Sequence, residues 1–250
     1  SLHNEQSLYR TQDKRKRKVA SVIMDNITIT EINREEAFRY MAAEGFTPDG
    51  VLADLADECE RRLIETVRPR YTYKVYPIES NNGSETVLSG FPAKLEGKDI
   101  SNLLEGCHSA VVMCATIGAE ADALIRRMQA EDMAKAVMTD SFASVAAEQV
   151  CNAFDEIIRE KYPDKFITWR FSPGYGDFPI SIQKKLLEAL NAMRLAGVCL
   201  NPSGMLTPVK SVTAVCGISD HELPKRRRGC ASCTMKGRCA YRKRGTRCEF

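Results

Sequence analysis

The segment from Thr168 to Pro179, TWRFSPGYGDFP, places the strongest constraint on how this 250-residue chain folds. It contains two prolines and two glycines. Proline removes a backbone donor and fixes φ, whereas glycine permits backbone conformations that other residues avoid. Neither a helix nor a strand can therefore pass through the segment. The strand predicted over residues 166–171 must end here, and a new helix, predicted over residues 181–193 with Ser181 as its N-cap, must begin after it.

The rest of the chain alternates irregularly between helical and strand-like patterns. Apolar residues at helical spacing, with capping and terminating signals, predict helices over residues 31–45, 47–70, 97–107, 119–130 and 132–160. Short segments rich in β-forming residues predict strands over residues 71–78, 86–90, 108–118 and 208–218. Because hairpin signals accompany this irregular order, an α+β fold fits better than a regular parallel sheet.

Charge divides the chain into three parts. Residues 1–23 carry six Lys or Arg and two Asp or Glu, and residues 221–250 carry ten and two. The overall charge of +3 therefore leaves a net −9 on residues 24–220. We predict a basic N-terminal extension over 1–23, a folded domain over 24–220, and a basic cysteine-rich tail over 221–250. Basic ends suit nucleic acid or an acidic protein partner.

Ten cysteines raise the question of a disulfide framework, and their placement argues against one. Six are scattered through apolar segments, where a free thiol behaves as a small hydrophobic group. The other four crowd into the tail with two-, five- and eight-residue gaps: Cys230, Cys233, Cys239 and Cys248. Four thiolates this close suit a tetrahedral zinc ion or an iron–sulfur cluster, and the spacing does not choose between them.

The cellular location of the chain is inferred from the absence of a signal sequence and of a membrane-spanning segment. Residues 1–19 have no apolar core of a secretory signal, and no apolar run approaches the roughly 20 residues of a membrane-spanning helix. We therefore expect a cytoplasmic protein with no membrane partner, in a compartment that keeps thiols reduced.

An ordered set of segments resembles a known family. The segments are CATIGAEADALIRRM, DSFASVAAEQVCNAFDEI, RFSPGYGDFPISIQKKLLEAL and NPSGMLTPVKSVTAVCGI. Together they resemble the activation domain of cobalamin-dependent methionine synthase, in its stand-alone form, over roughly residues 30–220. The strongest motif is Arg-x-x-Pro-Gly-Tyr, which begins at Arg170 and ends at Tyr175, and SGMLTP supports it. The resemblance implies a twisted, mainly antiparallel sheet with flanking helices.

The resemblance also implies a function. Such a domain binds S-adenosylmethionine over a corrinoid whose cobalt has been oxidised to cobalt(II). One electron restores cobalt(I), and the methyl group of S-adenosylmethionine traps it as methylcobalt. The chain contains no Asp-x-His-x-x-Gly segment, so a corrinoid methyltransferase, methionine synthase or a relative, must carry the cobalamin as a partner in trans. A flavodoxin- or ferredoxin-type protein would supply the electron.

The resemblance implies which residues bind S-adenosylmethionine. Arg170 would bind the ligand carboxylate in a forked geometry. The carbonyl of Ser172 would accept a hydrogen bond, and Gly174 would let the backbone approach the ligand. Tyr175 would offer a flat face with a polar tip, and Glu148 would offset the positive charge of the ligand. No catalytic side chain is implied, since the organometallic chemistry belongs to the corrinoid.

Two departures from the family keep other functions open. No acidic ligand is found near the N-terminal end, and Gly176 stands where a proline often follows the tyrosine. A docking or scaffold module for a corrinoid protein, without catalysis, is therefore the second hypothesis. A zinc-containing nucleic-acid-binding protein is the third. It fits less well, because Tyr241 alone interleaves the basic tail residues and the body is acidic.

Overall fold

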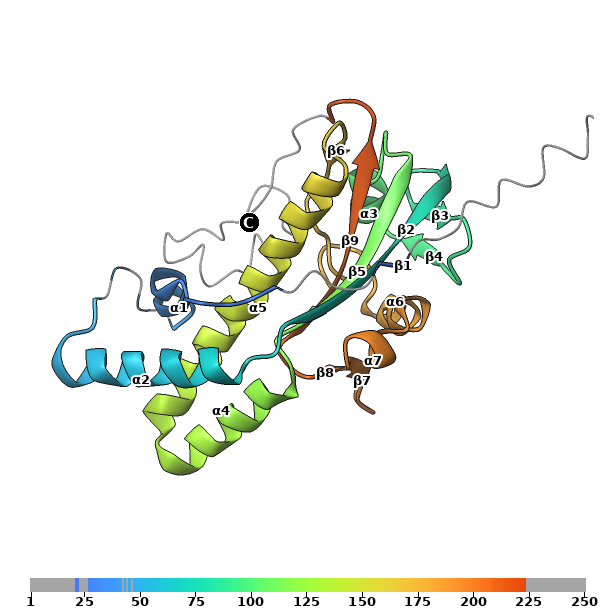
Figure 1. The fold of residues 1–250 in the computed structure, drawn as a ribbon. Coiled ribbons are helices and arrows are strands. Elements are labelled where there is room, and N and C mark those ends of the chain that lie inside the picture. The colour runs from blue at the N-terminus through green and yellow to red at the C-terminus, as the bar shows by residue number, and fades with distance from the viewer. Residues whose placement is uncertain (1–20, 23–26, 42, 44, 46, 224–250) are drawn as a thin grey trace, which may run out of the picture.

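The computed structural model describes residues 21–22, 27–41, 43, 45 and 47–223, and the predicted α+β class is confirmed over these residues (Figure 1). One sheet has the strand order β4-β3-β2-β5-β9-β6, β1 pairs with β2 beside this path, and all of these pairs are antiparallel. The strands are β1 (Ser21–Val22), β2 (Arg70–Asn81), β3 (Glu85–Leu88), β4 (Lys94–Glu96), β5 (Ser109–Thr116), β6 (Phe166–Ile167) and β9 (Ser211–Ser219). A separate hairpin joins β7 (Cys199–Leu200) to β8 (Leu206–Thr207).

Strand β5 forms the centre of the sheet. It pairs along its whole length with β2 and with β9, and all eight of its residues are buried. Val111, Met113 and Ala115 belong to the hydrophobic cluster on one face of the sheet. Ala110, Val112 and Cys114 belong to the cluster on the other face. A strand buried on both sides has no polar alternation, which explains its continuous apolar sequence.

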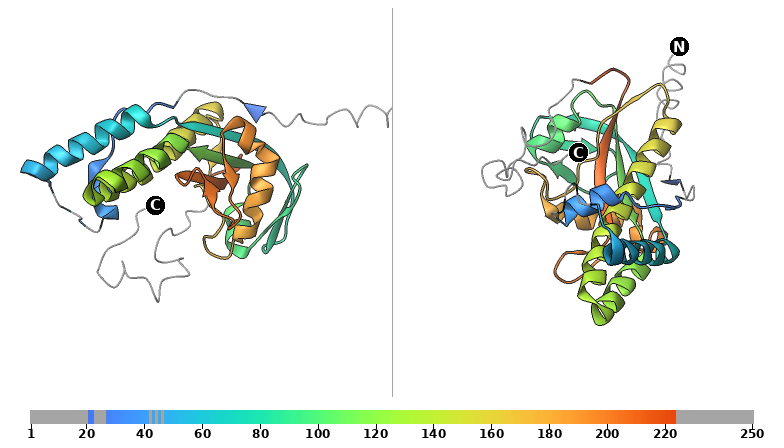
Figure 2. Two further views of the ribbon diagram at one scale, coloured as in Figure 1. Left: turned by 90° about the horizontal axis from the view of Figure 1, so that it is seen from below. Right: turned by 90° about the vertical axis from the view of Figure 1, so that its left-hand side faces the viewer.

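Helices cover both faces of the sheet. The face that contains Val111 is covered by α1 (Arg34–Tyr40), α2 (Gly50–Thr66), α4 (Ala119–Glu131) and α5 (Met133–Lys161). The opposite face is covered by α3 (Lys98–Leu103), the 3-10 helix Ile180–Ile182, α6 (Gln183–Leu190) and α7 (Ala192–Leu195). Figure 2, left, shows α5 and α6 on opposite sides of the sheet.

Helix α5 is 29 residues long and is buried along much of one side. It begins at Asp132, whose carboxylate accepts a hydrogen bond from the amide of Ala134 at 2.7 Å. Near its other end, the ring of Phe154 lies against two tyrosines of β2, with centroids 5.5 Å from Tyr71 and 5.4 Å from Tyr73. This packing fixes the helix across the sheet, so residues on the exposed side of α5 have a defined position.

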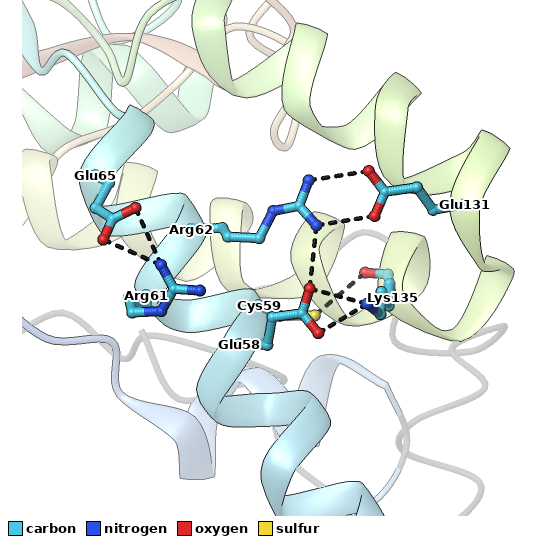
Figure 3. A network of polar contacts seen from close by, with 7 residues as sticks. All are labelled: Glu58, Cys59, Arg61, Arg62, Glu65, Glu131 and Lys135. Atoms are coloured by element: carbon cyan, nitrogen blue, oxygen red, sulfur yellow. Dashed lines mark hydrogen bonds and ion pairs between the residues drawn. The ribbon is translucent and has the colours of Figure 1, made fainter.

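A charged network joins α2 to α4 and α5 (Figure 3). The guanidinium of Arg62 donates two parallel hydrogen bonds to Glu131, at 2.8 and 3.0 Å, and a third to Glu58 at 3.1 Å. Glu58 also accepts from Lys135 at 2.7 Å. These positive partners hold the pKa of the Glu58 carboxyl below its usual value. The network orients the three helices, and none of its residues is among those predicted to bind the ligand.

The strand predicted over residues 166–171 is shorter in the structure. β6 ends at Ile167, and Phe171 returns to β9 only through an isolated bridge to Val215. A side chain causes the interruption: the amide of Thr168 still donates to the carbonyl of Gly217 at 3.0 Å, but the hydroxyl of Thr168 accepts the hydrogen bond from the amide of Gly217 at 2.7 Å. A side chain thereby takes the place of a backbone carbonyl, and the ladder stops.

The helix predicted over residues 181–193 also differs. Ser181 lies inside the 3-10 helix and does not cap α6, so that prediction was wrong. Asn191, at φ +53°, separates α6 from α7, because a left-handed residue breaks the helical path. In the part of the chain that the structure describes, no helix has the length and apolar character needed to span a membrane.

Candidate functional site

The loop of residues 172–179 is held by its own backbone. The amide of Gly174 donates to the carbonyl of Phe178 at 2.8 Å, and the amide of Phe178 donates to the carbonyl of Tyr175 at 3.0 Å. Gly174 has a φ of +91°, which L side chains rarely adopt, so the turn requires glycine there. The ring of Phe178 is buried in the core below. The shape of the loop is therefore defined by its own hydrogen bonds and by the burial of Phe178.

A second anchor ties the same loop to α3. The carboxylate of Asp177 accepts hydrogen bonds from the amides of Lys98 at 2.8 Å and Asp99 at 2.9 Å. It thereby satisfies donors that the start of a helix leaves free. A Cβ atom on Gly176 would overlap the carboxylate of Asp99. The departure from proline at this position thus has a structural reason, because the loop runs too close to α3 for a side chain.

Arg170 leaves the start of this loop and reaches across to α5. Its Nη1 donates to Asp155 at 2.7 Å, and its Nη2 donates to Asn152 at 3.1 Å and to Glu148 at 3.3 Å. The side chain is 15% exposed, so most of the guanidinium is shielded from water. Arg170 and Glu148, which the sequence predicts as ligand-binding partners, are thus in direct contact.

The carboxyl of Asp155 has an unusual electrostatic environment. Burial raises its pKa, and the charge and hydrogen bond of Arg170 oppose that shift without cancelling it. Two buried thiols lie in the same electrostatic environment, and burial raises the pKa values of Cys151 and Cys216 to about 12. Both thiols stay protonated at neutral pH, so they pack as small hydrophobic groups and are not nucleophiles.

A groove opens beside Glu148, between α1 and α5. Its volume is about 380 Å³, and its lining residues are Tyr40, Met41, Val137, Asp140, Ser141, Ser144 and Glu148. Asp140 and Ser144 are both bound by Lys210, each at 2.8 Å, so the charge of Asp140 is already balanced. Glu148 lines the groove and also contacts Arg170, so it is the residue that the groove and the arginine contacts share.

Tyr40 lines the groove with Glu148, and Tyr175 lies near Tyr40. Tyr40, at the end of α1, is 38% exposed. Burial and the nearby charge of Glu148 raise the pKa of its hydroxyl, and Tyr175 contributes to the same shift. The ring of Tyr175 lies 6.5 Å from that of Phe171 and is exposed. Two accessible aromatic rings therefore lie near one another, one from the loop and one from α1.

The structure brings several predicted residues to one place and leaves others outside its description. Glu148 and Arg170 are in direct contact, and Tyr175 lies near Tyr40, which lines the groove with Glu148. The carbonyl of Ser172 already accepts a hydrogen bond from the amide of Tyr175 at 3.2 Å, and Gly174 shapes the turn. Cys230, Cys233, Cys239 and Cys248 lie outside the described residues. Among those that are described, no three His, Cys, Asp or Glu side chains are grouped to hold a metal ion.

Sequence reasoning missed Tyr40, Asp155, Asn152 and the groove. A signal for part of the site was available, because Asp140, Ser144, Glu148 and Asn152 recur every fourth residue along the middle of the helix, where most other residues are small or apolar. Such a polar row marks one exposed helix face. No comparable pattern pointed to Tyr40, since only the folding of α1 against α5 brings it to Glu148.

Comparison with known proteins identifies the fold. No protein-family model matches the chain, and no curated protein matches it. Thirteen chains of known structure match, among them a crystal structure of the MetH reactivation domain bound to AdoHcy. The TM-score is 0.63 at 17% sequence identity, and the match covers 91% of this chain and 86% of that chain. This chain therefore has the fold of the MetH reactivation domain, as the sequence motifs predict.

Proposed function

We propose that this chain binds S-adenosylmethionine and reactivates, in trans, a corrinoid methyltransferase whose cobalt has been oxidised. The observation that carries the proposal is the meeting of Arg170 and Glu148 beside an open groove, on a fold shared with a reactivation domain solved with AdoHcy. AdoHcy is S-adenosylmethionine without its methyl group and its sulfonium charge, and the two molecules share the adenosine and the α-amino acid group.

The groups at the site suit each part of the ligand. The guanidinium of Arg170 would bind the ligand carboxylate, and Glu148 would face the cationic ammonium or sulfonium. The exposed rings of Tyr175 and Tyr40 offer flat surfaces for the adenosine and for a cation. The groove of about 380 Å³ lies within the ~300–1,000 Å³ usual for small-molecule sites.

The contribution of the chain to the reaction is placement. The corrinoid, carried by the partner protein, supplies the cobalt that takes up one electron and then accepts the methyl group. The rigid loop and α5 would hold the donor with its methyl group facing the partner. Positioning of this kind accounts for about 7–11 kcal/mol of a barrier in favourable cases. The chain needs no acid, base or nucleophile of its own for this step.

The decisive experiment titrates S-adenosylmethionine into the purified chain by calorimetry and then measures methyl transfer. The acceptor is cobalt(II) methionine synthase lacking its own activation domain, with a chemical reductant and methyl-labelled S-adenosylmethionine. We expect saturable binding and label on the corrinoid only when the chain is present. Binding without label transfer would contradict the proposed reactivation.

Docking without catalysis is the second candidate, and one observation favours it. The guanidinium of Arg170 is already engaged by three acceptors of α5, and the carbonyl of Ser172 is engaged by Tyr175. A module that only docks on a corrinoid protein would keep these contacts. It would bind the cobalt(II) protein equally well with and without S-adenosylmethionine. Measuring that binding with the same proteins in the presence and absence of S-adenosylmethionine tests this.

The cysteine tail leads to a separate proposal. We propose that Cys230, Cys233, Cys239 and Cys248 hold one metal centre, either zinc or an iron–sulfur cluster that relays the electron. Anaerobic purification with metal analysis and an absorption spectrum tests this. One zinc or one cluster per chain is expected, and replacing Cys233 and Cys239 by serine should remove it. A metal-free chain would contradict the proposal, and colourless zinc protein would exclude the relay.

A further inference from the structure

Three acceptors of α5 hold the guanidinium of Arg170, and they do so unequally. The contact with Asp155 is the shortest, at 2.7 Å, and that side chain is 22% exposed. The contact with Glu148 is the longest, at 3.3 Å, and that side chain is 49% exposed. Water screens an exposed ion pair and competes for its hydrogen bonds, whereas a shielded pair keeps its strength. The two ends of the guanidinium therefore differ in how easily they change partner.

The two nitrogens of the guanidinium also divide the partners between them. Nη1 is taken by Asp155, whereas Nη2 is shared by the amide of Asn152 and the carboxylate of Glu148. Exchange at Nη2 leaves the bond at Nη1 in place, so the arginine keeps its position while one partner is replaced. Glu148 also lines the groove, so its side chain, once freed from Arg170, would face the place where a ligand would lie.

We propose that Asp155 is a positioning residue that holds Arg170, and that the Glu148–Arg170 contact opens to admit the zwitterionic α-amino acid group of a ligand. The inference rests on the proposed function and specifies how its ligand is recognised. The ligand carboxylate replaces Glu148 at Nη2, and Glu148 turns to the ligand ammonium. Every charge is paired before and after the exchange, so no carboxylate or cation is left alone in a shielded site.

The arrangement makes a distinct claim about selectivity. A ligand with only an ammonium group would leave Nη2 of Arg170 without its carboxylate partner once Glu148 had moved. A ligand without the amino acid group would leave the Glu148–Arg170 contact intact and would form no ion pair with either residue. The site should therefore prefer S-adenosylmethionine to decarboxylated S-adenosylmethionine and to 5′-methylthioadenosine.

The test compares these three molecules by calorimetry on the full chain. For the wild type we expect S-adenosylmethionine to bind on the order of 100-fold more tightly than its decarboxylated form, because the charge-assisted contact of the ligand carboxylate with Nη2 is lost. In Asp155→Asn the preference should fall below about tenfold, while binding of 5′-methylthioadenosine stays unchanged. Asp155→Glu, which restores the carboxylate, should recover part of the preference.

A matched control and a second variant keep the test sharp. Glu156→Gln removes an equal charge from the next position, where the side chain is exposed and pairs with Arg159, and it should leave the preference intact. Glu148→Gln should weaken the two ligands that carry an ammonium group and spare 5′-methylthioadenosine. This variant applies even if Asp155→Asn does not fold.

The outcomes separate the positioning role from the proposed function. Equal weakening of all three ligands in Asp155→Asn, or an unchanged preference, would overturn the positioning role and leave S-adenosylmethionine binding standing. If Glu148→Gln bound the two ligands that carry an ammonium group as tightly as the wild type does, relative to 5′-methylthioadenosine, the exchange would be overturned. If the wild-type chain bound none of the three ligands, the inference and the proposed ligand would fail together.

Discussion

Replacing Arg170 by methionine is expected to weaken S-adenosylmethionine binding by on the order of 100-fold or more, and to destabilise the fold. Methionine keeps much of the length of the side chain and removes the guanidinium. The carboxyl of Asp155 then loses its 2.7 Å partner in a site where burial already raises its pKa. An unpaired, largely shielded carboxylate costs about 1–3 kcal/mol.

The pH dependence of this loss identifies its cause. The native pKa of Asp155 lies above its unfolded value, so the stability linked to this group is present below the unfolded pKa, about 3.9, and is lost as pH rises through the native pKa. Without Arg170 the native pKa rises further. Urea unfolding should therefore show a larger difference between variant and wild type at pH 7 than at pH 4.

A control at another arginine tests whether the position matters. Arg61 lies on α2 and pairs with Glu65 at the surface. Arg61→Met should leave both ligand binding and the pH dependence of unfolding close to wild type. A loss of stability in Arg170→Met that is the same at both pH values would show that Asp155 is not the group responsible.

Replacing Phe154 by alanine is expected to lower the free energy of unfolding by about 3–5 kcal/mol. The side chain is fully buried, and its ring packs against Tyr71 and Tyr73 between α5 and the sheet. The substitution removes an aromatic ring and leaves a cavity that two stacked tyrosines cannot fill. Denaturant unfolding followed by circular dichroism measures the change.

The size of the remaining side chain provides the control for this prediction. Phe154→Leu keeps most of the apolar volume and should cost clearly less than the alanine variant. Because Asp155 follows Phe154 on α5, the alanine variant should also weaken S-adenosylmethionine binding once the helix can shift. Equal stability of the alanine and leucine variants would contradict the role of Phe154 as the support of α5.

The elements of the fold were predictable where local signals are strong. The sequence predicted β5, α4 and α5 correctly. A strand buried on both faces is a continuous apolar run, and a long helix repeats its apolar residues at helical spacing. The ends of the strand and the helix on either side of the loop were not predicted correctly. Thr168 ends β6 with a side-chain hydrogen bond to Gly217, 49 residues away, and no local pattern encodes that partner.

The candidate site divides along the same line. The sequence alone predicts the residue types of the site and the turn at Gly174. A position at φ +91° requires glycine, and the prolines and glycines of the loop end the strand before the next helix begins. The ordered motifs also led to the fold, which the match to the MetH reactivation domain bears out.

Only the tertiary structure decided which groups meet. Arg170 could have paired with any surface carboxylate, and packing of α5 across the sheet selected Asp155, Asn152 and Glu148. Folding of α1 against α5 added Tyr40 and the groove. The physical reason is that sequence patterns reflect backbone preference and burial, which act over a few residues, whereas the partners of a charge depend on how distant elements pack.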